Sequence, residues 1–338
     1  MVKYVAQRLL MMIVILCGVL VITFALSRIL PGSPVEMMLG HRPTQEQIDL
    51  AKAELHLDKS IPIQFAYYVG DMVQGDFGKS LRTGQPVLDD VVERMTATLE
   101  LTTIAVILII LIGIPIGVIS AVKQNSISDH GARSFSIAGM ALPVFLVGMM
   151  LQMLFYGKLA WFPLQGRMNS EVLLDYEFAR VTGFYLIDTL LAGEWVAFKS
   201  AAAHLVLPVL TLTLAAMAVV TRITRNTMVE ALGEDFVRTA KAYGLPKNKI
   251  YFGYALRATL IPMMTVVGLT YGFMLGNSVI VEYVFDWPGL GGYVVGAIVK
   301  NDFPAVMGVT LFLSTAYLLI NFIIDLLYYV ADPRLRAV

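Results

Sequence analysis

The chain has 338 residues, of which 57% are hydrophobic, and its mean hydropathy is +0.73. This composition is too apolar for a soluble globular domain and indicates a protein embedded in a membrane. The net charge is zero, but the charges are unevenly placed along the chain. The single cysteine, Cys17, excludes an intrachain disulfide and a thiolate metal site, and we expect it to be a small packing residue in the first apolar run.

The apolar runs predict an all-α integral membrane protein with six transmembrane helices, because about 20 apolar residues are needed to cross a bilayer. The first run is longer than a signal-peptide core and no cleavage pattern follows it, so we interpret it as a retained anchor. Residues 183–193 are apolar but too short to span, which favours an interfacial or folded extracytoplasmic segment. The six runs are residues 9–30, 101–122, 134–156, 205–221, 258–281 and 303–330.

The distribution of basic residues predicts the orientation. Basic residues concentrate in cytoplasmic loops, so the side richer in lysine and arginine is expected inside the cell. One side has 13 Lys and Arg against 5 Asp and Glu, whereas the other side has 12, with Arg28 at the end of the first run included, against 19 over about twice the length. We therefore expect a multi-pass protein of the cytoplasmic (inner) membrane with both termini in the cytoplasm. The basic side comprises residues 1–8, 122–133, 222–257 and 331–338.

Residues 31–98 form a polar stretch that is too long for a simple connection and predict a small extracytoplasmic subdomain between the first two spans. A capped helix is expected to begin at 44–46. The triplet Gly78-Lys79-Ser80 resembles the end of a phosphate-binding loop, but Val73 stands where that motif requires its first glycine, and no buried strand precedes it. We expect no nucleotide site there. The remaining predicted regions are an N-terminal tail with the first span (1–30), a core membrane domain (99–330) and a cytoplasmic tail (331–338).

The stretch 230–262 is basic and is flanked on both sides by apolar sequence. Glu234 and Asp235 suit the first turn of a short helix, Lys241 suits its last turn, and Gly244 suits its end. A helix of about three turns is not stable alone in water, so it must dock on something. It either packs beneath its own membrane domain or inserts into a groove of a partner. Its expected apolar face consists of Phe236, Ala240 and Tyr243.

Two further patterns allow two interpretations each. Glycines spaced four apart permit close approach of helices, so they indicate either internal packing or the wall of a pathway. A turn rich in proline and glycine, with aromatic residues suited to the membrane interface, is either an anchored turn or part of an outer gate. The glycines are Gly113, Gly117, Gly268, Gly272 and Gly276, and the turn contains Asp286, Trp287, Pro288 and, farther on, Tyr293.

The stretches GEDFVRTAKAYGL (233–245) and YALRATLIPMMT (254–265) resemble the cytoplasmic coupling loop of B-type permease subunits of dipeptide and oligopeptide ABC importers. In the general importer signature an acidic residue stands where this chain has Arg238, and Pro262 lies farther from Gly244; both departures are typical of the peptide branch. The resemblance covers nearly the whole chain and includes the 75–87 region and the turn at 287–291. Residues 166–195 are most similar to the dipeptide subgroup.

The resemblance implies a type I ABC importer permease fold that moves dipeptides or oligopeptides. It implies a second homologous permease, two ATPase subunits and an extracytoplasmic substrate-binding protein as partners. It implies no cofactor in this chain, because ATP and Mg would be bound by the ATPase subunits. Asp286, Trp287 and Pro288 would then lie at the outer gate or contact the binding protein. The residues implied to couple to the ATPase are Glu234, Asp235, Arg238, Thr239, Ala240 and Gly244.

Catalytic signatures are missing from the sequence. Among the intramembrane positions only Asp325 is clearly charged, whereas an ion-coupled carrier needs a buried ion site. The four histidines are scattered, and the motifs of zinc proteases and serine hydrolases are absent, so we expect no catalytic or metal-binding residues and no enzyme. An ion-coupled transporter or channel and an intramembrane hydrolase remain alternatives. Other cargoes are open as well: nickel chelates, glutathione, haem or sugars.

Overall fold

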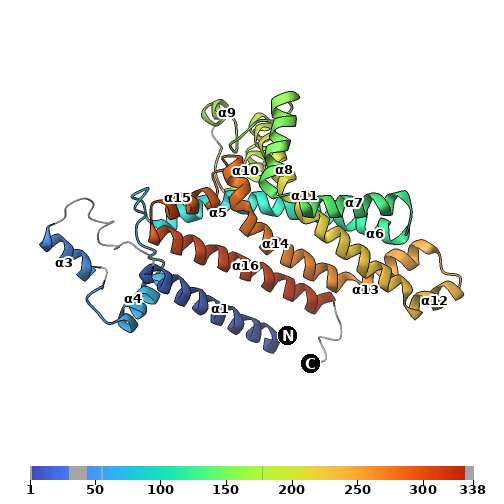
Figure 1. The fold of residues 1–338 in the computed structure, drawn as a ribbon, viewed down its shortest axis with the longest axis horizontal. Coiled ribbons are helices and arrows are strands. Elements are labelled where there is room, and N and C mark those ends of the chain that lie inside the picture. The colour runs from blue at the N-terminus through green and yellow to red at the C-terminus, as the bar shows by residue number, and fades with distance from the viewer. Residues whose placement is uncertain (1, 30–43, 55, 177, 332–338) are drawn as a thin grey trace. The chain divides into compact units, whose positions relative to one another are not determined.

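The computed structural model describes residues 2–29, 44–54, 56–176 and 178–331. Within these residues the regular structure is helical, and the only β pairing is an isolated bridge between Lys79 and Pro86. The chain forms two compact units, one of residues 1–96 and 289–319, the other of residues 97–288 and 320–338. The expected all-α class is confirmed (Figure 1).

Five helices are long and apolar enough to cross a membrane, and a bent pair brings the number to six if it counts as one span. The predicted number of six is consistent with this arrangement. The span-length helices are α1 (Val2–Ile29), α5 (Val87–Leu108) continued by the π-helical turn η1 (Ile109–Gly113) and α6 (Ile114–Val122), α11 (Trp195–Gly233), α14 (Leu260–Val284) and α16 (Phe303–Ala331).

The third predicted span, residues 134–156, is not one straight helix. It divides into α7 (Ile127–Ala141) and a second part, Val144–Lys158, at an angle of 105°. Pro143 causes the break, because its ring disfavours helical backbone at the preceding residue, and Leu142 has extended angles of φ −91° and ψ 129°. The second part comprises α8 (Val144–Leu151) and the π-helical segment η2 (Gln152–Lys158).

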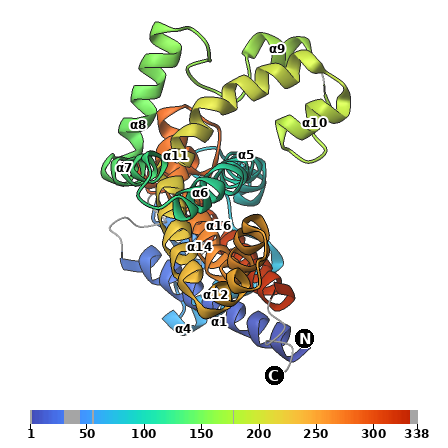
Figure 2. The same ribbon diagram turned by 90° about the vertical axis from the view of Figure 1, so that its right-hand side faces the viewer.

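Helix α11 is the centre of its unit, residues 97–288 and 320–338. It packs against α6, α7, α8 and α14, and its first turns lie beside α10 (Tyr185–Ala192) (Figures 1 and 2). The apolar run 205–221 is much shorter than this helix of 39 residues. Hydropathy detects only the apolar middle, whereas the helix continues through the polar sequence on both sides. Two short helices complete this unit before the basic loop, α9 (Ser170–Asp175) and α10.

The other unit, residues 1–96 and 289–319, contains α1, the first turns of α5, part of α16 and three shorter helices. The expected capped helix is confirmed: the Gln47 amide donates to Thr44 Oγ1 at 3.3 Å, and the Thr44 amide donates to Gln47 Oε1 at 2.9 Å. Phe24 of α1 packs edge-on against Phe65, with ring centroids 5.3 Å apart. The shorter helices are α3 (Gln45–Glu54), α4 (Ile61–Gln74) and α15 (Leu290–Val299).

The loop after α4 is held by buried polar contacts. Ser80 donates its hydroxyl to Asp302 at 2.6 Å, and Tyr293 donates its hydroxyl to Asp90 at 3.1 Å. Burial raises the pKa of Tyr293 to about 12, so the phenol stays protonated and can donate. The Gly78-Lys79-Ser80 triplet follows helix α4 and a short loop, so the strand that a phosphate-binding loop requires is missing among the described residues before it.

Three expectations about single residues are wrong. Cys17 is exposed on α1 and does not pack inside the chain. Tyr293 is buried inside the chain, so its ring is not exposed to a membrane interface. Asp325 is not the only carboxylate in a span-length helix, because Glu100 of α5 and Glu282 of α14 are also there and almost fully buried. The sequence count missed these two because both helices extend past the ends of their apolar runs.

Candidate functional site

The basic loop folds around the short helix α12 (Asp235–Ala242). Residues 222–233 of the predicted loop are the last three turns of α11, so the chain turns only at Glu234, whose backbone is extended. Beyond α12 come the π-helical segment η3 (Lys249–Ala255) and the single turn α13 (Leu256–Ala258), which leads into α14. Helix α12 packs against both α11 and η3, and Figure 1 shows it at the end of α11.

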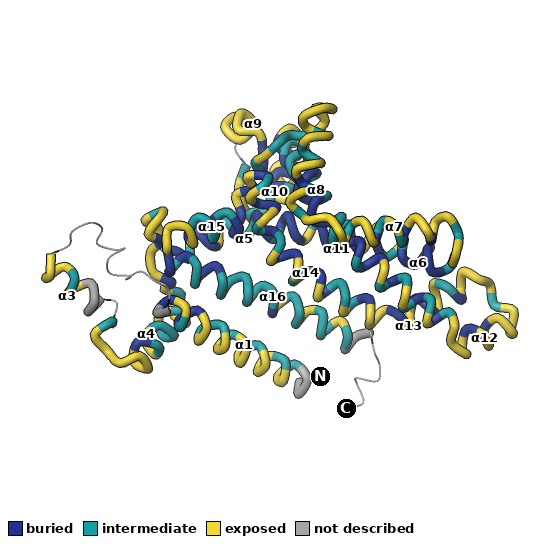
Figure 3. Tube along the Cα trace, in the orientation of Figure 1, coloured by how far each residue is buried: buried dark blue, intermediate teal, exposed yellow. Residues whose placement is uncertain are grey.

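Two side chains attach α12 to the rest of the loop. Val237 is fully buried and Ala240 is 7% exposed, and both pack against buried Ile250 of η3. The predicted apolar face is therefore only partly right. Ala240 faces inward, but Phe236 is 39% exposed and Tyr243 is 83% exposed. The helix docks on its own chain through a narrow strip and presents its other faces outward (Figure 3).

Gly244 ends α12 in the way that the sequence predicts. Its φ is +71°, a left-handed conformation that glycine adopts without steric cost. The Gly244 amide donates to the Lys241 carbonyl at 3.0 Å, and the Leu245 amide donates to the Ala240 carbonyl at 3.1 Å. These two bonds form a Schellman motif, and Leu245 packs on the Val237–Ala240 cluster as such motifs commonly require. The motif fixes the exit direction of the chain.

The predicted coupling residues lie on one short element, and most are accessible. Arg238 forms an exposed ion pair with Asp235 at 3.2 Å, and Thr239 donates its hydroxyl to the Asp235 carbonyl at 3.0 Å. Since both charges are exposed, the pair adds little stability and its groups are available to a partner. The sequence interpretation missed Phe236 and Tyr243 as part of this surface. The exposed residues of α12 and its two flanking positions are Glu234, Asp235, Phe236, Arg238, Thr239, Lys241, Ala242 and Tyr243.

Gly113, at the end of η1, and Gly117, in α6, are sites of close helix packing. A Cβ on Gly117 would lie 2.7 Å from Thr224 Cβ and 2.8 Å from the Thr221 carbonyl oxygen of α11. A Cβ on Gly113 would lie 2.9 Å from Met217. Real side-chain atoms do not approach so closely, so these glycines let α6 and α11 come together.

The glycines of α14 do not share one environment. A Cβ on Gly268 would collide with Ile324, so this position is packed. A Cβ on Gly276 would meet no atom within 4 Å, and Gly276 is exposed. Gly272 is partly buried. The three glycines are equally spaced on one helix, but Gly268 is closely packed and Gly276 is open, so their spacing does not indicate a common role.

The turn after α14 is anchored from inside. Trp287 is 2% exposed, and its indole donates to the Ala97 carbonyl at 3.0 Å. Trp287 is therefore held inside this unit and does not present its ring at the surface. Asp286 and Pro288 are exposed, and Asp286 has a φ of +45°. The turn thus exposes the charged Asp286 and the rigid Pro288 on either side of the buried Trp287.

A buried ion pair lies close to this turn in the same unit, and the sequence analysis did not find it. Arg167 Nε donates to Glu100 at 3.0 Å, and the second oxygen of that carboxylate accepts from the Leu186 amide at 2.9 Å. The Arg167 guanidinium also stacks 3.8 Å from the centre of the Tyr185 ring. The only signal in the sequence was the position of Glu100 beside an apolar run. Its partner Arg167 could not be identified, because it lies 67 residues farther along the chain.

Metal chemistry has no support in the described residues, where no group of three or more His, Cys, Asp or Glu side chains could hold an ion. The helices define the class of protein, a multi-pass α-helical membrane protein with a docked helix in its basic loop.

The buried carboxylate of Glu282 also has a hydrogen-bond partner. It accepts a hydrogen bond from the Thr98 hydroxyl at 2.7 Å.

The chain belongs to the family of inner membrane components of binding-protein-dependent transport systems. The family model matches residues 113–337, and the model of the family's N-terminal region matches residues 1–102. The chain is accordingly a component of a transport system in the inner membrane and not an enzyme. The recognition made from residues 233–265 is confirmed.

Three curated relatives cover almost the whole chain. The di/tripeptide transport system permease protein of Pseudomonas aeruginosa (strain UCBPP-PA14) is 42% identical over 99% of this chain and 99% of its own length. The probable D,D-dipeptide transport system permease protein of Escherichia coli (strain K12) is 44% identical over 97% and 96%. The glutathione transport system permease protein of Salmonella choleraesuis (strain SC-B67) is 34% identical over 99% of each chain.

Proposed function

We propose that the chain is the permease subunit of an ABC importer for dipeptides, energised by separate ATPase subunits that bind ATP and Mg. The observation that carries the proposal is α12, a helix held by Val237 and Ala240 with its charged and aromatic side chains left outside. Such a helix can transmit force because it is fixed to α11 and η3 on one side and free to contact a partner on the other.

The mechanism is alternating access driven by differential binding. ATP biases the membrane helices only if α12 contacts the ATPase differently in the two states of the pathway. The Schellman motif at Gly244 and the packing of Ile250 keep α12 and η3 together, so movement of α12 reaches α14 through α13. Hydrolysis then returns the helices to the inward-open state.

The remaining partners follow the family description. A substrate-binding protein delivers the cargo from outside, and a second homologous permease completes the pathway as a heterodimer. The exposed residues Asp286 and Pro288 and the 31–98 subdomain are the proposed docking regions for the binding protein. Both termini and α12 lie in the cytoplasm in this proposal, supported by the excess of lysine and arginine on that side. Residues 30–43 and the tail 332–338 lie outside the described residues.

Dipeptides are the proposed cargo because two of the relatives described above, at 42% and 44% identity, are named for di/tripeptide and D,D-dipeptide transport. The relative named for glutathione transport is 34% identical, which makes glutathione the alternative. Uptake of a labelled dipeptide by cells that express the complete system tests the assignment, with unlabelled dipeptide and glutathione as competitors. Competition by glutathione at lower concentration than by dipeptide would contradict it.

The coupling surface is tested by replacing its exposed aromatic residues. We expect the double variant Phe236→Ser/Tyr243→Ser to lose most of the ATPase subunits on copurification and to remain in the membrane, because neither residue supports the fold. Trp161→Ser replaces an aromatic outside the loop whose exposure, 64%, lies between those of Phe236 and Tyr243, and this matched control retains the ATPase. Full retention of the ATPase by the double variant would refute this surface.

A further inference from the structure

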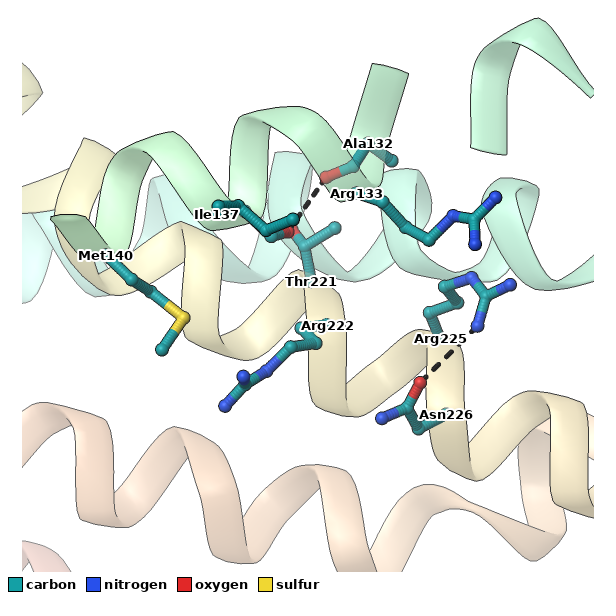
Figure 4. Close-up of a pocket in the computed structure, with 9 residues that line it drawn as sticks. Ala132, Arg133, Ile137, Met140, Thr221, Arg222, Arg225 and Asn226 are labelled. Carbon is teal, nitrogen blue, oxygen red and sulfur yellow. Dashed lines mark hydrogen bonds between the residues drawn. The ribbon is translucent and has the colours of Figure 1, made fainter. Parts of the chain in front are cut away.

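A cavity of about 210 Å³ lies between α7 and α11, within one compact unit. It is close to the end of the apolar run of α11, where arginines replace apolar residues. Figure 4 shows its amphipathic order, with Met140 and Ile137 toward one end and Arg133 and Arg225 toward the other. The site described above does not use this cavity, whose lining consists of Ala132, Arg133, Ser136, Ile137, Met140, Thr221, Arg222, Arg225 and Asn226.

Positive charge in the cavity exceeds the negative charge beside it. The nearest carboxylate, Asp129, is fully buried and accepts from Arg225 Nε at 2.6 Å and Nη2 at 2.9 Å. It also accepts from Ser120 Oγ at 2.6 Å and from the Asn125 amide at 2.9 Å. Asp129 therefore neutralises Arg225, and its accepting capacity is used by these four bonds.

The other two arginines keep donor atoms available to a ligand. The Arg133 side chain is 42% exposed, and its Nη2 lies 2.9 Å from His130 Nδ1. Its Nε is 3.7 Å from Asp129, beyond hydrogen-bond distance, and this one buried atom has no hydrogen-bond partner among the described residues. Arg222 is exposed at the rim, and no ion pair of Arg222 is recorded in the described part of the chain. A buried N–H without an acceptor, here Nε of Arg133, is costly, which favours an anionic occupant.

We propose that this cavity binds the headgroup phosphate of an anionic phospholipid, with an acyl chain along Ile137 and Met140. The two side chains are 71% and 47% exposed and form the apolar part of the lining. Basic pockets between membrane helices recognise anionic headgroups by this combination of charge and apolar surface. The lipid ties α7 to the part of α11 that contains Arg222 and Arg225, before the chain enters α12 at Asp235. This inference goes beyond the proposed function and does not depend on the cargo.

The test counts lipids on the intact transporter complex by native mass spectrometry after incubation with phosphatidylglycerol or phosphatidylcholine. We expect one tightly retained phosphatidylglycerol, and binding about fivefold weaker in Arg222→Gln, the effect of one arginine near a charged lipid surface. Lys123→Gln removes an exposed charge from the adjacent α6–α7 turn, outside the cavity, and is the matched control with unchanged binding. Equal retention of both lipids, or equal binding by Arg222→Gln, overturns the proposal.

A second variant separates a lipid from a free anion. Ile137→Asn places an amide on the apolar lining without touching the arginines, so it weakens phosphatidylglycerol binding if an acyl chain lies there. Inorganic phosphate at millimolar concentration is expected not to displace the lipid. Displacement by phosphate together with unchanged binding in Ile137→Asn would assign the cavity to free phosphate, and displacement by dipeptide would assign it to cargo; either result overturns the lipid proposal.

Discussion

At the scale of single residues, Gly244 is required for a left-handed backbone at the end of α12, and this backbone sets the direction in which the chain continues to η3. Its φ of +71° is strained for any residue with a Cβ, although no neighbouring atom lies within 4 Å of one. A substitution therefore acts through backbone conformation and not through a steric clash. The cost of left-handed backbone is about 1–2 kcal/mol, and asparagine tolerates it better than β-branched residues.

We predict that Gly244→Val uncouples ATP hydrolysis from uptake while membrane insertion is retained, because the Schellman bonds that set the direction of η3 are lost. Gly244→Asn is predicted to keep most of the activity. Both are measured as uptake of labelled dipeptide alongside ATPase activity in proteoliposomes. Gly233→Ala is the control, since Gly233 has room for a Cβ and ordinary backbone angles. Normal uptake by Gly244→Val would contradict the role of this cap.

Arg167 carries the second residue-scale prediction. Arg167→Met leaves the buried Glu100 carboxylate without its charge partner, so we expect a loss of about 3–5 kcal/mol of stability. The double variant Glu100→Gln/Arg167→Met is predicted to recover a large part of that loss, because no unpaired charge remains. Thermal unfolding of the purified complex measures both. A double variant less stable than Arg167→Met would show that the pair is not the cause.

At the scale of elements, α6 and α11 depend on the absence of side chains at two positions. We predict that Gly117→Leu destabilises the protein by about 1–3 kcal/mol or more, since a Cβ alone would already lie 2.7 Å from Thr224. Gly276→Ala on α14 is the control and is expected to be neutral, because its Cβ meets no atom. The comparison is made by thermal unfolding in detergent. A tolerated Gly117→Leu would mean that the two helices can separate at little cost.

Local signals predicted some elements well and left others out. The limits of α12 followed from Glu234, Asp235 and Gly244, because caps and breakers act within one turn. The 105° break at Pro143 was not predicted, since the apolar run continues through it and hydropathy does not register backbone angles. Helix α15 was missed for a similar reason: the glycines at 291 and 292 indicated only a turn, whereas burial of Leu290 and Ala297 stabilises a helix.

For the site, too, local sequence signals predicted some residues and missed others. The residues predicted to couple to the ATPase come from one contiguous stretch, and most of them are accessible. The Glu100–Arg167 pair and the Asp129–Arg225 pair were not predicted, because their partners are 67 and 96 residues apart and a single sequence carries no signal of such contacts. The exposure of Phe236 and Tyr243 also depends on packing. The face of α12 that packs on Ile250 consists of Val237 and Ala240, which leaves Phe236 and Tyr243 outside it.

At the scale of the whole molecule, the orientation can be tested because Cys17 is the only cysteine. In a Cys17→Ser background we predict that Val181→Cys reacts with a membrane-impermeant maleimide in intact cells, whereas Lys247→Cys reacts only after permeabilisation. Both positions are exposed, so accessibility is decided by the side of the membrane. The opposite pattern of labelling would place α12 outside the cell and contradict coupling to an ATPase.

The central claim is that this chain moves solute only when ATP-driven subunits act on α12. Reconstitution measures it directly, by comparing dipeptide accumulation in proteoliposomes that contain the complete complex with those that contain this chain alone. The account predicts ATP-dependent accumulation by the complete complex and none by the single chain, with or without a proton or sodium gradient. Accumulation against a concentration gradient by the chain alone would contradict it.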